Sequence, residues 1–158
     1  MDNILKAVQG NKKAIKSLIE DNIEDIYKLI FLHTKYEDDS KIILRDTIEY
    51  IQENITKLNN TEEVILWMYK IIIINTNNFL ESIGMVENDY KCFKGEKIDL
   101  YKAIDLLDGK YKSAVILKYY FDLSYEEIGQ VVNLNPDTVQ IYIRQSLKKI
   151  KASVGEYL

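Results

Sequence analysis

Cysteine, histidine and proline are almost missing from this chain. Cys92 is the only cysteine among 158 residues, so no internal disulfide can form, and a reducing compartment is the simplest expectation. The one histidine, His33, has no Cys or Asp at ligand spacing, which argues against a zinc site and against His-based acid–base catalysis. One proline and six glycines give too few turn residues for a protein of many strands.

The motifs that mark most enzymes and exported proteins are missing too. There is no Gly-rich phosphate loop, and no Ser or Cys stands in a recognisable motif with a His. We therefore predict no catalytic residue, no metal and no cofactor, and we expect that the chain is not an enzyme. Met1-Asp2 opens no signal peptide, and the most apolar run, 64–74, is too short to cross a bilayer. We expect a cytoplasmic protein without membrane insertion.

The charge of the chain is unevenly placed. Apolar residues make up 47% and charged residues 29%, which suits a folded chain of one ordinary domain or two small ones, and the net charge is −4. A negative body is unfavourable for nucleic-acid binding, because phosphate neutralisation supplies most of that affinity. Between 137 and 151, however, a single acid (Asp137) stands against Arg144, Lys148, Lys149 and Lys151. This pattern fits a protein that touches DNA only while something else holds it there.

Apolar residues recur at helical spacing along nearly the whole chain, which predicts an all-α fold. In the first half, Asn11 is expected to start a helix, and the polar stretch 36–40 to separate it from the next one. Asn60, with Glu63 three residues later, marks a further expected helix start, and Gly84 marks its end. Steps of four and three, typical of a helix packed in a bundle, connect Leu44, Ile48, Ile51, Ile55 and Leu58.

These helical segments are predicted to form two small domains. The first is expected over 1–84 and the second over 99–158, joined by a linker at 85–98 that shows no clear apolar period. A short amphipathic helix opens the second domain and is expected to end at Asp108-Gly109.

Two helix starts lie close together near the end of the chain. Ser124 and Glu127 fit the capping-box pattern for the first of them. Asn135 can cap the second, and Pro136 then falls at its first position, where a missing N–H costs nothing. Asn133, between the two helices, tolerates the left-handed conformation that a sharp turn requires. The pattern predicts a helix-turn-helix.

The two faces of this predicted motif differ in character. The residues expected to face one another across the turn are apolar: Ile128, Val131, Leu134, Val139, Ile143 and Leu147. The outer face of the second helix is polar: Gln140, Tyr142, Arg144, Gln145, Lys148 and Lys149. Because Gln and Arg side chains can read base edges in the major groove, this face indicates duplex DNA as a partner.

The C-terminal half resembles region four of bacterial RNA polymerase sigma factors of the small extracytoplasmic-function type. Its family pattern is Leu-Pro-x-x-Tyr/Phe-Arg, an apolar helix, Leu-Ser-Tyr-x-Glu-Ile-Ala, a turn, and Thr-Val-Lys-Ser-Arg. The likeness runs over residues 106–151 and includes both caps. Matching positions are Leu107, Tyr111, Leu123-Ser124-Tyr125, Glu127-Ile128, Thr138-Val139 and Lys148-Lys149.

The N-terminal half is similar, more weakly, to region two of the same family. Residues 67–71, WMYKI, resemble its Trp-Leu-Tyr-Arg-Ile segment, and residues 45–48, RDTI, its Gln-Glu-Thr-Phe element. The resemblance implies an all-helical sigma factor in which region two clamps polymerase and opens the minus-ten element, while region four binds the minus-thirty-five element. It also implies RNA polymerase core and promoter DNA as partners, with an anti-sigma factor expected from the family.

The resemblance assigns three sets of contact residues. Contacts to the minus-thirty-five element are expected from Thr138, Gln140, Ile141, Tyr142, Arg144, Gln145, Lys148 and Lys149. Contacts to the minus-ten element are expected from Trp67, Tyr69, Lys70, Asn75 and Asn78. Contacts to polymerase are expected from Asp39, Arg45 and Asp46.

Several of these residues have a structural alternative. Trp67 and Tyr69 could stack on an unpaired base, but core packing is expected for Trp67, and burial stays an alternative for Tyr69. Asn75, Asn77 and Asn78 could line a pocket for a flipped base or simply end a helix. Residues 71–74, all Ile, circle a whole helix turn, so one or two of them must be exposed or meet a partner.

Departures from the family pattern keep two other functions open. Lys41 and Ile42 fill places that are usually acidic, and Gln140, Tyr142 and Gln145 replace residues that are often basic. Each lost basic residue removes a phosphate contact and weakens sequence-independent binding. The alternatives are a degenerate sigma-like regulatory protein, which binds polymerase or a regulator without starting transcription, and an ordinary helix-turn-helix repressor or activator, which would need dimer symmetry.

Overall fold

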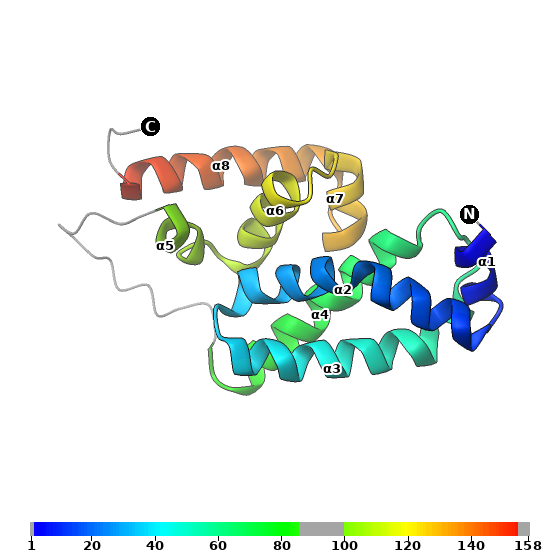
Figure 1. The fold of residues 1–158 in the computed structure, drawn as a ribbon. Helices are drawn as coiled ribbons and strands as arrows, with labels where there is room; N and C mark the ends of the chain where they lie inside the picture. Colours follow the sequence, from blue (N-terminus) through cyan, green and yellow to red (C-terminus); the bar gives the residue numbers. More distant parts are fainter. Residues whose placement is uncertain (1, 86–99, 155–158) are drawn as a thin grey trace. The chain divides into compact units, whose positions relative to one another are not determined.

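The computed structural model describes residues 2–85 and 100–154, and all regular secondary structure in those ranges is helical (Figure 1). The chain divides into two compact units, residues 1–79 and 80–158, which we call the N-terminal and C-terminal units. Cys92 and all of the predicted linker except Met85 lie outside the described residues. The fold is the all-α type that the apolar periodicity predicted. No helix in the described ranges has the length and apolar character needed to cross a membrane.

The N-terminal unit consists of α1 (Asp2–Val8), α2 (Lys12–Thr34), α3 (Glu37–Asn54), the short 3₁₀ helix η1 (Ile55–Lys57) and all but the last three residues of α4 (Val64–Ser82). Helices α2 and α3 lie side by side, and α1 packs on α2 (Figure 1). Large apolar side chains with almost no exposed surface form the core: Ile26, Leu29, Ile30, Ile43, Ile51, Ile55, Met68 and Ile72.

Helix α2 begins and ends with side-chain and backbone caps. Asn11 is the predicted cap, and its Oδ1 accepts hydrogen bonds of 3.1 Å from the backbone N–H groups of Lys13 and Ala14. At the other end, Lys35 adopts the left-handed conformation with φ 63°, and its N–H donates to the carbonyl of Phe31. The predicted polar break over 36–40 is wrong, because α3 already begins at Glu37. The acidic residues of that stretch form the first turn of α3, where the helix dipole favours negative charge.

The buried face of α3 differs from the predicted seam by one position. Ser40, Ile43, Thr47 and Ile51 are buried, whereas the predicted Leu44, Ile48 and Leu58 are only half-buried. Hydroxyl residues can join the core here because each has a partner. The Ser40 hydroxyl lies 2.7 Å from that of Thr34, and the Thr47 hydroxyl accepts from Asn75 Nδ2 at 3.3 Å. A pattern that counts apolar residues alone cannot detect such positions.

Helix α4 starts later than the sequence suggested and ends where it predicted. The Asn60 side chain accepts from the backbone N–H of Glu62 at 2.9 Å and so forms a local turn, while the helix begins only at Val64. Gly84, with φ 76°, ends the helix, and the N–H of Met85 donates to the carbonyl of Leu80 at 3.0 Å. Of the four consecutive isoleucines, Ile74 is the exposed one, at 42%, which confirms that the run could not be buried completely.

The C-terminal unit contains α5 (Leu100–Asp105), α6 (Gly109–Tyr120), α7 (Tyr125–Val132) and α8 (Pro136–Val154). Helix α8 packs against the other three (Figure 1). The predicted helix end at Asp108-Gly109 is wrong: α5 stops at Asp105, and Asp108 stands before the first turn of α6, where its carbonyl accepts from Lys112 N–H at 2.7 Å. The core consists mainly of Ala103, Ile104, Leu107, Ala114, Ile116, Leu117, Ile128, Val139 and Ile143.

Candidate nucleic-acid interface

The capping box that the sequence predicted holds the start of α7. The backbone N–H of Glu127 donates to Ser124 Oγ at 3.1 Å, and the backbone N–H of Ser124 donates to Glu127 Oε2 at 2.7 Å. Two of the N–H groups that lack helical partners at this end are therefore satisfied by side chains. This confirmed cap fixes where the helix-turn-helix begins.

The bend between α7 and α8 is made by backbone hydrogen bonds onto one carbonyl. Asn133 has φ 56° and ψ 53°, as predicted, and both its N–H and that of Leu134 donate to the carbonyl of Gly129. Asn135 Oδ1 accepts from Thr138 N–H at 2.7 Å, and Pro136 is the first residue of α8. The predicted helix-turn-helix is thus confirmed.

Gly129 permits an unusually close approach within this bend. A Cβ atom at this position would lie 2.5 Å from the carbonyl oxygen of Leu134, a backbone atom that has no rotamer with which to move away. The family pattern has Ala at the corresponding place after Glu-Ile. The bend of this chain is therefore tighter than a side chain at residue 129 would allow.

The inward face of α8 is set by steps of four, three and four residues. Val139, Ile143, Ser146 and Ile150 are buried, whereas Leu147, which was predicted to join them, is 43% exposed. The stripe passes through the serine because the apolar neighbours at residues 143 and 150 bring that side of the helix inward. The Ser146 hydroxyl is buried without a hydrogen-bond partner among the described residues.

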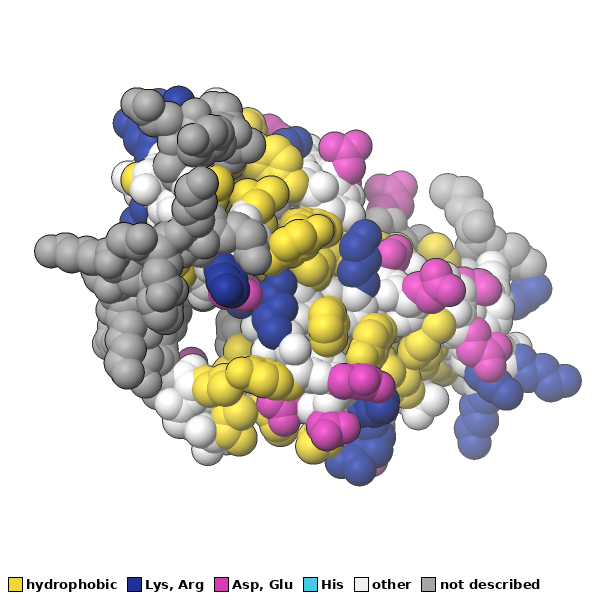
Figure 2. All heavy atoms as spheres, turned by 60° about the vertical axis from the view of Figure 1, so that its left-hand side comes forward, with side chains coloured by type: hydrophobic (Ala, Val, Ile, Leu, Met, Phe, Trp, Pro, Cys, Tyr) yellow, Lys and Arg dark blue, Asp and Glu magenta, His cyan; other side chains and the backbone are white. Residues whose placement is uncertain are grey.

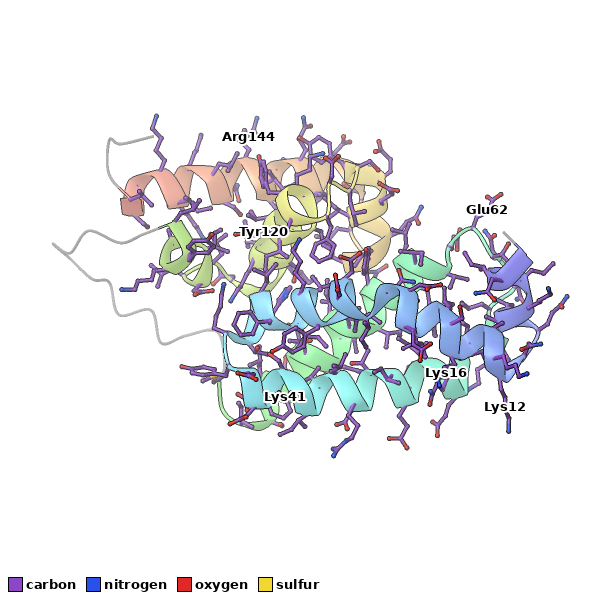
Figure 3. The ribbon with its side chains drawn as sticks, in the orientation of Figure 1. Lys12, Lys16, Lys41, Glu62, Tyr120 and Arg144 are labelled. Atoms are coloured by element: carbon purple, nitrogen blue, oxygen red, sulfur yellow. The ribbon has the colours of Figure 1, made fainter. Side chains whose placement is uncertain are left out.

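The opposite face of α8 is open to solvent. Gln140, Ile141, Arg144 and Lys148 are all exposed and lie together on this face. Figure 3 shows Arg144 projecting from the side of α8 that faces away from α6. Neither Arg144 nor Lys148 has an ion pair within the part of the chain that the structure describes. These side chains are available to a major groove without first breaking an internal contact.

A flank of α8 between these two faces is occupied by α6. Tyr142 stacks on Tyr111 with ring centroids 4.2 Å apart and an interplanar angle of 13°. The Tyr111 hydroxyl donates to Gln145 Oε1 at 3.0 Å, and Lys149 Nζ lies 4.8 Å from the centroid of the Tyr111 ring. Thr138, on the same flank, is half-buried. The residues predicted to contact the minus-thirty-five element therefore fall into two groups. One group lies on the solvent-exposed face, and the other lies on the flank that contacts α6.

Tyr111 was absent from the predicted contact set, although it is part of the family-like pattern. It lies 34 positions before Gln145 in the sequence, so no helical period could relate the two residues. Only the packing of α6 on α8 brings them together.

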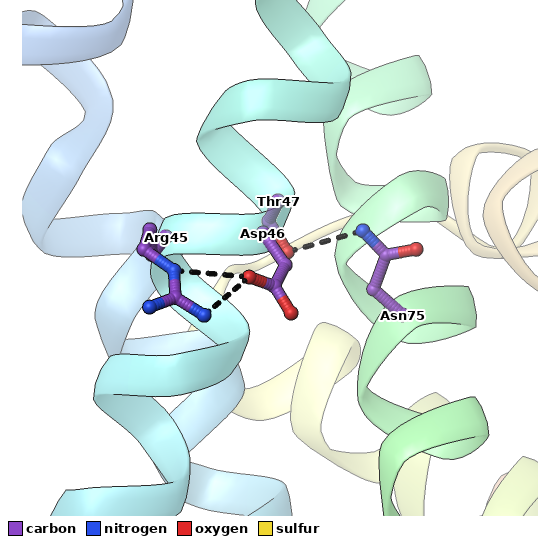
Figure 4. Close-up of polar contacts among 4 residues, drawn as sticks. All are labelled: Arg45, Asp46, Thr47 and Asn75. Carbon is purple, nitrogen blue, oxygen red and sulfur yellow. Dashed lines mark hydrogen bonds and ion pairs between the residues drawn. The ribbon is translucent and has the colours of Figure 1, made fainter.

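Some of the residues of the N-terminal unit predicted to contact polymerase or the minus-ten element lie close together, and the others lie apart from them. Asn75 of α4 donates to Thr47 of α3, and beside it the Arg45 guanidinium donates to Asp46 Oδ1 at 3.1 and 3.2 Å (Figure 4). A pocket of about 370 Å³ opens between α3 and α4. Its lining brings together one predicted polymerase residue, Asp46, and two predicted minus-ten residues, Asn75 and Asn78. The other lining residues are Ile43, Tyr50 and Phe79.

Trp67, Tyr69 and Lys70 are not among the residues that line this pocket. Tyr69 is buried, with 8% of its surface exposed, and Trp67 is half-buried, so Trp67 keeps the more accessible ring and its expected core packing is only partial. Burial, and then the charge of Asp25, raises the pKa of the Tyr69 phenol. The burial alternative is the one that the structure shows for Tyr69.

The first turns of α3 carry compensated charges. Lys41, which stands where the family is usually acidic, lies 2.6 Å from Glu37, and this hydrogen-bonded ion pair lowers the pKa of Glu37 and raises that of Lys41. Asp39 is half-buried, whereas Arg45 and Asp46 are exposed. Figure 2 shows acidic, basic and apolar side chains interspersed on one face of the molecule. Within the described ranges, no group of three or more His, Cys, Asp or Glu residues could hold a metal ion.

Comparison with known proteins agrees with this architecture. Residues 97–150 match the family described as Sigma-70, region 4, the segment that contains the helix-turn-helix. The chain is also 29% identical, over 157 residues, to the RNA polymerase sigma factor SigV of Bacillus subtilis (strain 168), covering 93% of this chain and 95% of that protein. The C-terminal segment is thus similar to region 4 of the sigma-70 family, and the chain resembles a sigma factor over nearly its whole length.

Solved structures share the fold of this chain. CnrH, in complex with the cytosolic domain of CnrY, superposes with a TM-score of 0.74 at 15% identity, covering 95% of this chain and 93% of that one. The sigma factor RpoE from Bartonella quintana, in complex with the anti-sigma factor NepR, gives a TM-score of 0.75 at 12% identity, covering 92% and 99%. At these identities the likeness concerns the fold alone.

Proposed function

We propose that this chain is a sigma factor of the extracytoplasmic-function type, which brings RNA polymerase core to promoters by placing α8 in the major groove of the minus-thirty-five element. One observation carries the proposal: a capped bend presents Gln140, Ile141, Arg144 and Lys148 together on an exposed face. A helix of this kind, with its partner helix crossing behind it, is the usual docking geometry of helix-turn-helix proteins.

The exposed residues differ in what they can recognise. The amide of Gln140 and the guanidinium of Arg144 suit base edges, with Arg best matched to the two acceptors of guanine. Ile141, 41% exposed, offers an apolar contact of the kind that thymine methyl groups accept. Lys148 is placed to hold a phosphate, which positions the helix without reading sequence.

The N-terminal unit supplies the remaining proposed contacts. The pocket lined by Asp46, Asn75 and Asn78 combines an acceptor with two amides, groups that can hydrogen-bond to the edge of an unstacked base. Trp67 and Lys70, both half-buried on α4, remain candidates for the minus-ten strand. Asp39 and Arg45 on α3 are proposed to contact polymerase, as the family resemblance implies.

The chain itself is proposed to carry out no chemistry. Polymerase makes the RNA, and this sigma factor contributes placement and base capture, so it works in the compartment of its polymerase, the cytoplasm. An anti-sigma factor is a proposed third partner, because two proteins of the same fold were solved with CnrY and with the anti-sigma factor NepR.

Run-off transcription with purified core on a cognate promoter tests the proposal. Arg144→Ala should weaken promoter binding by about 1–3 kcal/mol, or roughly 5- to 150-fold, if the guanidinium contacts a guanine. Lys16→Ala is a suitable control, since Lys16 is an exposed cation of α2 paired with Glu20 at 3.6 Å. Unchanged transcription by the Arg144 variant would reject its role.

Two further results would favour the alternative functions. The net charge of −4 predicts weak promoter binding by the free chain at physiological salt. Tight, specific binding by a dimer without polymerase would indicate an ordinary repressor or activator. A chain that binds core but yields no transcript from any promoter would indicate a degenerate, sigma-like regulator.

A further inference from the structure

We propose that Tyr111 is a positioning residue: it orients Gln145 and so determines which base Gln145 favours in the major groove. Tyr111 itself does not contact DNA. The inference rests on the proposed function, because it assumes that α8 enters the major groove. It starts from the flank of α8 that α6 occupies, where one aromatic side chain contacts three of the residues assigned to the minus-thirty-five element.

The Tyr111 ring has little freedom to move. It is half-buried, and the ring of Tyr142 stacks on it at 4.2 Å with an interplanar angle of 13°. Its neighbour Lys112 anchors the same turn of α6, because Lys112 Nζ, on a side chain only 12% exposed, lies 3.0 Å from Asp105 of α5. The hydroxyl of Tyr111 is therefore presented to α8 from a fixed place.

This fixed hydroxyl orients the Gln145 amide. Tyr111 donates its proton to Gln145 Oε1 at 3.0 Å, so the amide oxygen is directed toward α6 and the two Nε2 hydrogens are left for an external acceptor. A glutamine that reads adenine uses both ends, because its oxygen accepts from N6 and its nitrogen donates to N7. Because Tyr111 holds the oxygen turned toward α6, Gln145 presents its amide nitrogen outward, acts as a donor and favours acceptor-rich edges such as N7 and O6 of guanine.

Lys149 belongs to the same cluster. Its ammonium lies 4.8 Å from the centroid of the Tyr111 ring and 3.6 Å from a carboxylate oxygen of Asp108. These contacts hold its ammonium beside α6. Tyr111 thereby organises one amide and one ammonium at once.

Tyr111→Phe isolates the hydroxyl, because it keeps the stack and the ring beneath Lys149. The holoenzyme, made of core and the full chain, would be assayed by transcription from promoters randomised across the minus-thirty-five element. We expect one position to lose its preference for guanine over adenine by about 2- to 10-fold, the worth of one neutral hydrogen bond. Tyr119→Phe, on the same helix and 57% exposed, should leave every preference unchanged.

A double-variant comparison separates positioning from a structural effect. In the Gln145→Ala background the preference should already be lost, and adding Tyr111→Phe should change nothing further. Equal thermal stability of wild type and Tyr111→Phe would confirm that the fold is intact. A base profile of Tyr111→Phe identical to wild type overturns the inference, as does a shift that persists without Gln145.

The same experiment distinguishes failure of the inference from failure of the proposed function. If Arg144→Ala changes the base profile and Tyr111→Phe does not, α8 reads the promoter and only the role of Tyr111 is wrong. If neither variant changes the profile, both the inference and the placement of α8 are wrong.

Discussion

The ammonium nitrogen of Lys149 lies 3.6 Å from a carboxylate oxygen of Asp108, while the adjacent Lys148 has no ion pair within residues 2–85 and 100–154. Two neighbouring lysines of one helix therefore differ in what they can offer to DNA. One is partly neutralised by its own protein, and the other keeps its full charge for a phosphate.

This difference predicts unequal salt dependence. Lys148→Ala should reduce the slope of log affinity against log salt for holoenzyme on promoter DNA by about 1, because one fewer counterion is released. Lys149→Ala should reduce this slope by less than Lys148→Ala does. Asp108→Asn should steepen the slope, because it frees the Lys149 ammonium. Filter binding over a series of salt concentrations measures all three, and equal losses for the two lysines would contradict the assignment.

The tight bend predicts a cost for a single methyl group at residue 129. Gly129→Ala places a Cβ 2.5 Å from the Leu134 oxygen, so the turn must open, and overpacking of this kind costs about 1–3 kcal/mol. The gain in helix propensity, about 1 kcal/mol, offsets only part of that cost. We expect a lower free energy of unfolding in urea, as well as weaker promoter binding.

Gln130→Ala is the matched control for that variant. Gln130 is exposed on the same helix, so its replacement changes propensity without filling any space. If Gly129→Ala were as stable as this control, the close approach to the Leu134 carbonyl would have no energetic importance.

The buried hydroxyl of α8 predicts a stabilising substitution. Ser146 Oγ has no partner among the described residues, and an unsatisfied buried polar group costs about 1–3 kcal/mol. Ser146→Ala should therefore raise the free energy of unfolding by about 1 kcal/mol. Ser153→Ala is the comparison on the same helix, since its hydroxyl donates to the Lys149 carbonyl at 2.9 Å and its loss should bring no such gain.

Burial of Tyr69 predicts a loss of stability at alkaline pH. Its pKa is raised from the ordinary 10.0, so as pH rises the unfolded chain releases the phenolic proton first. The contribution is complete below the unfolded pKa and is lost as pH rises from there toward the folded pKa. Tyr69→Phe should flatten the fall in melting temperature between about pH 9 and pH 11, whereas Tyr36→Phe, whose ring is 55% exposed, should not.

The helix ends with side-chain caps and the turn at Asn133 were the most predictable part of this fold, whereas the ends near residues 36–40, 60–64 and 105–109 were not. Asn11, the Ser124 and Glu127 pair, Asn133 and Asn135 act through local hydrogen bonds that span only a few residues, so their sequence spacing already specifies them. The helix-turn-helix followed from these signals, and with it the composition of the exposed α8 face.

The faces of α3 and α8 were predictable only in part. Ser40 and Thr47 are buried because their hydroxyls form hydrogen bonds with residues of α2 and α4. The local sequence around Ser40 and Thr47 does not predict these partners. Ser146 replaces the expected Leu147 in the buried stripe for reasons of packing around Ile143 and Ile150. The division of the DNA-contact set also depends on tertiary structure, since it arises from α6.

The position of Trp67 has a practical consequence. It is the only tryptophan in the chain, and it is half-buried on α4 in the N-terminal unit. Intrinsic indole emission is therefore a built-in optical reporter of that unit. Binding of a ligand to α4 can be followed by a change in the wavelength or intensity of Trp67 emission, without any attached dye.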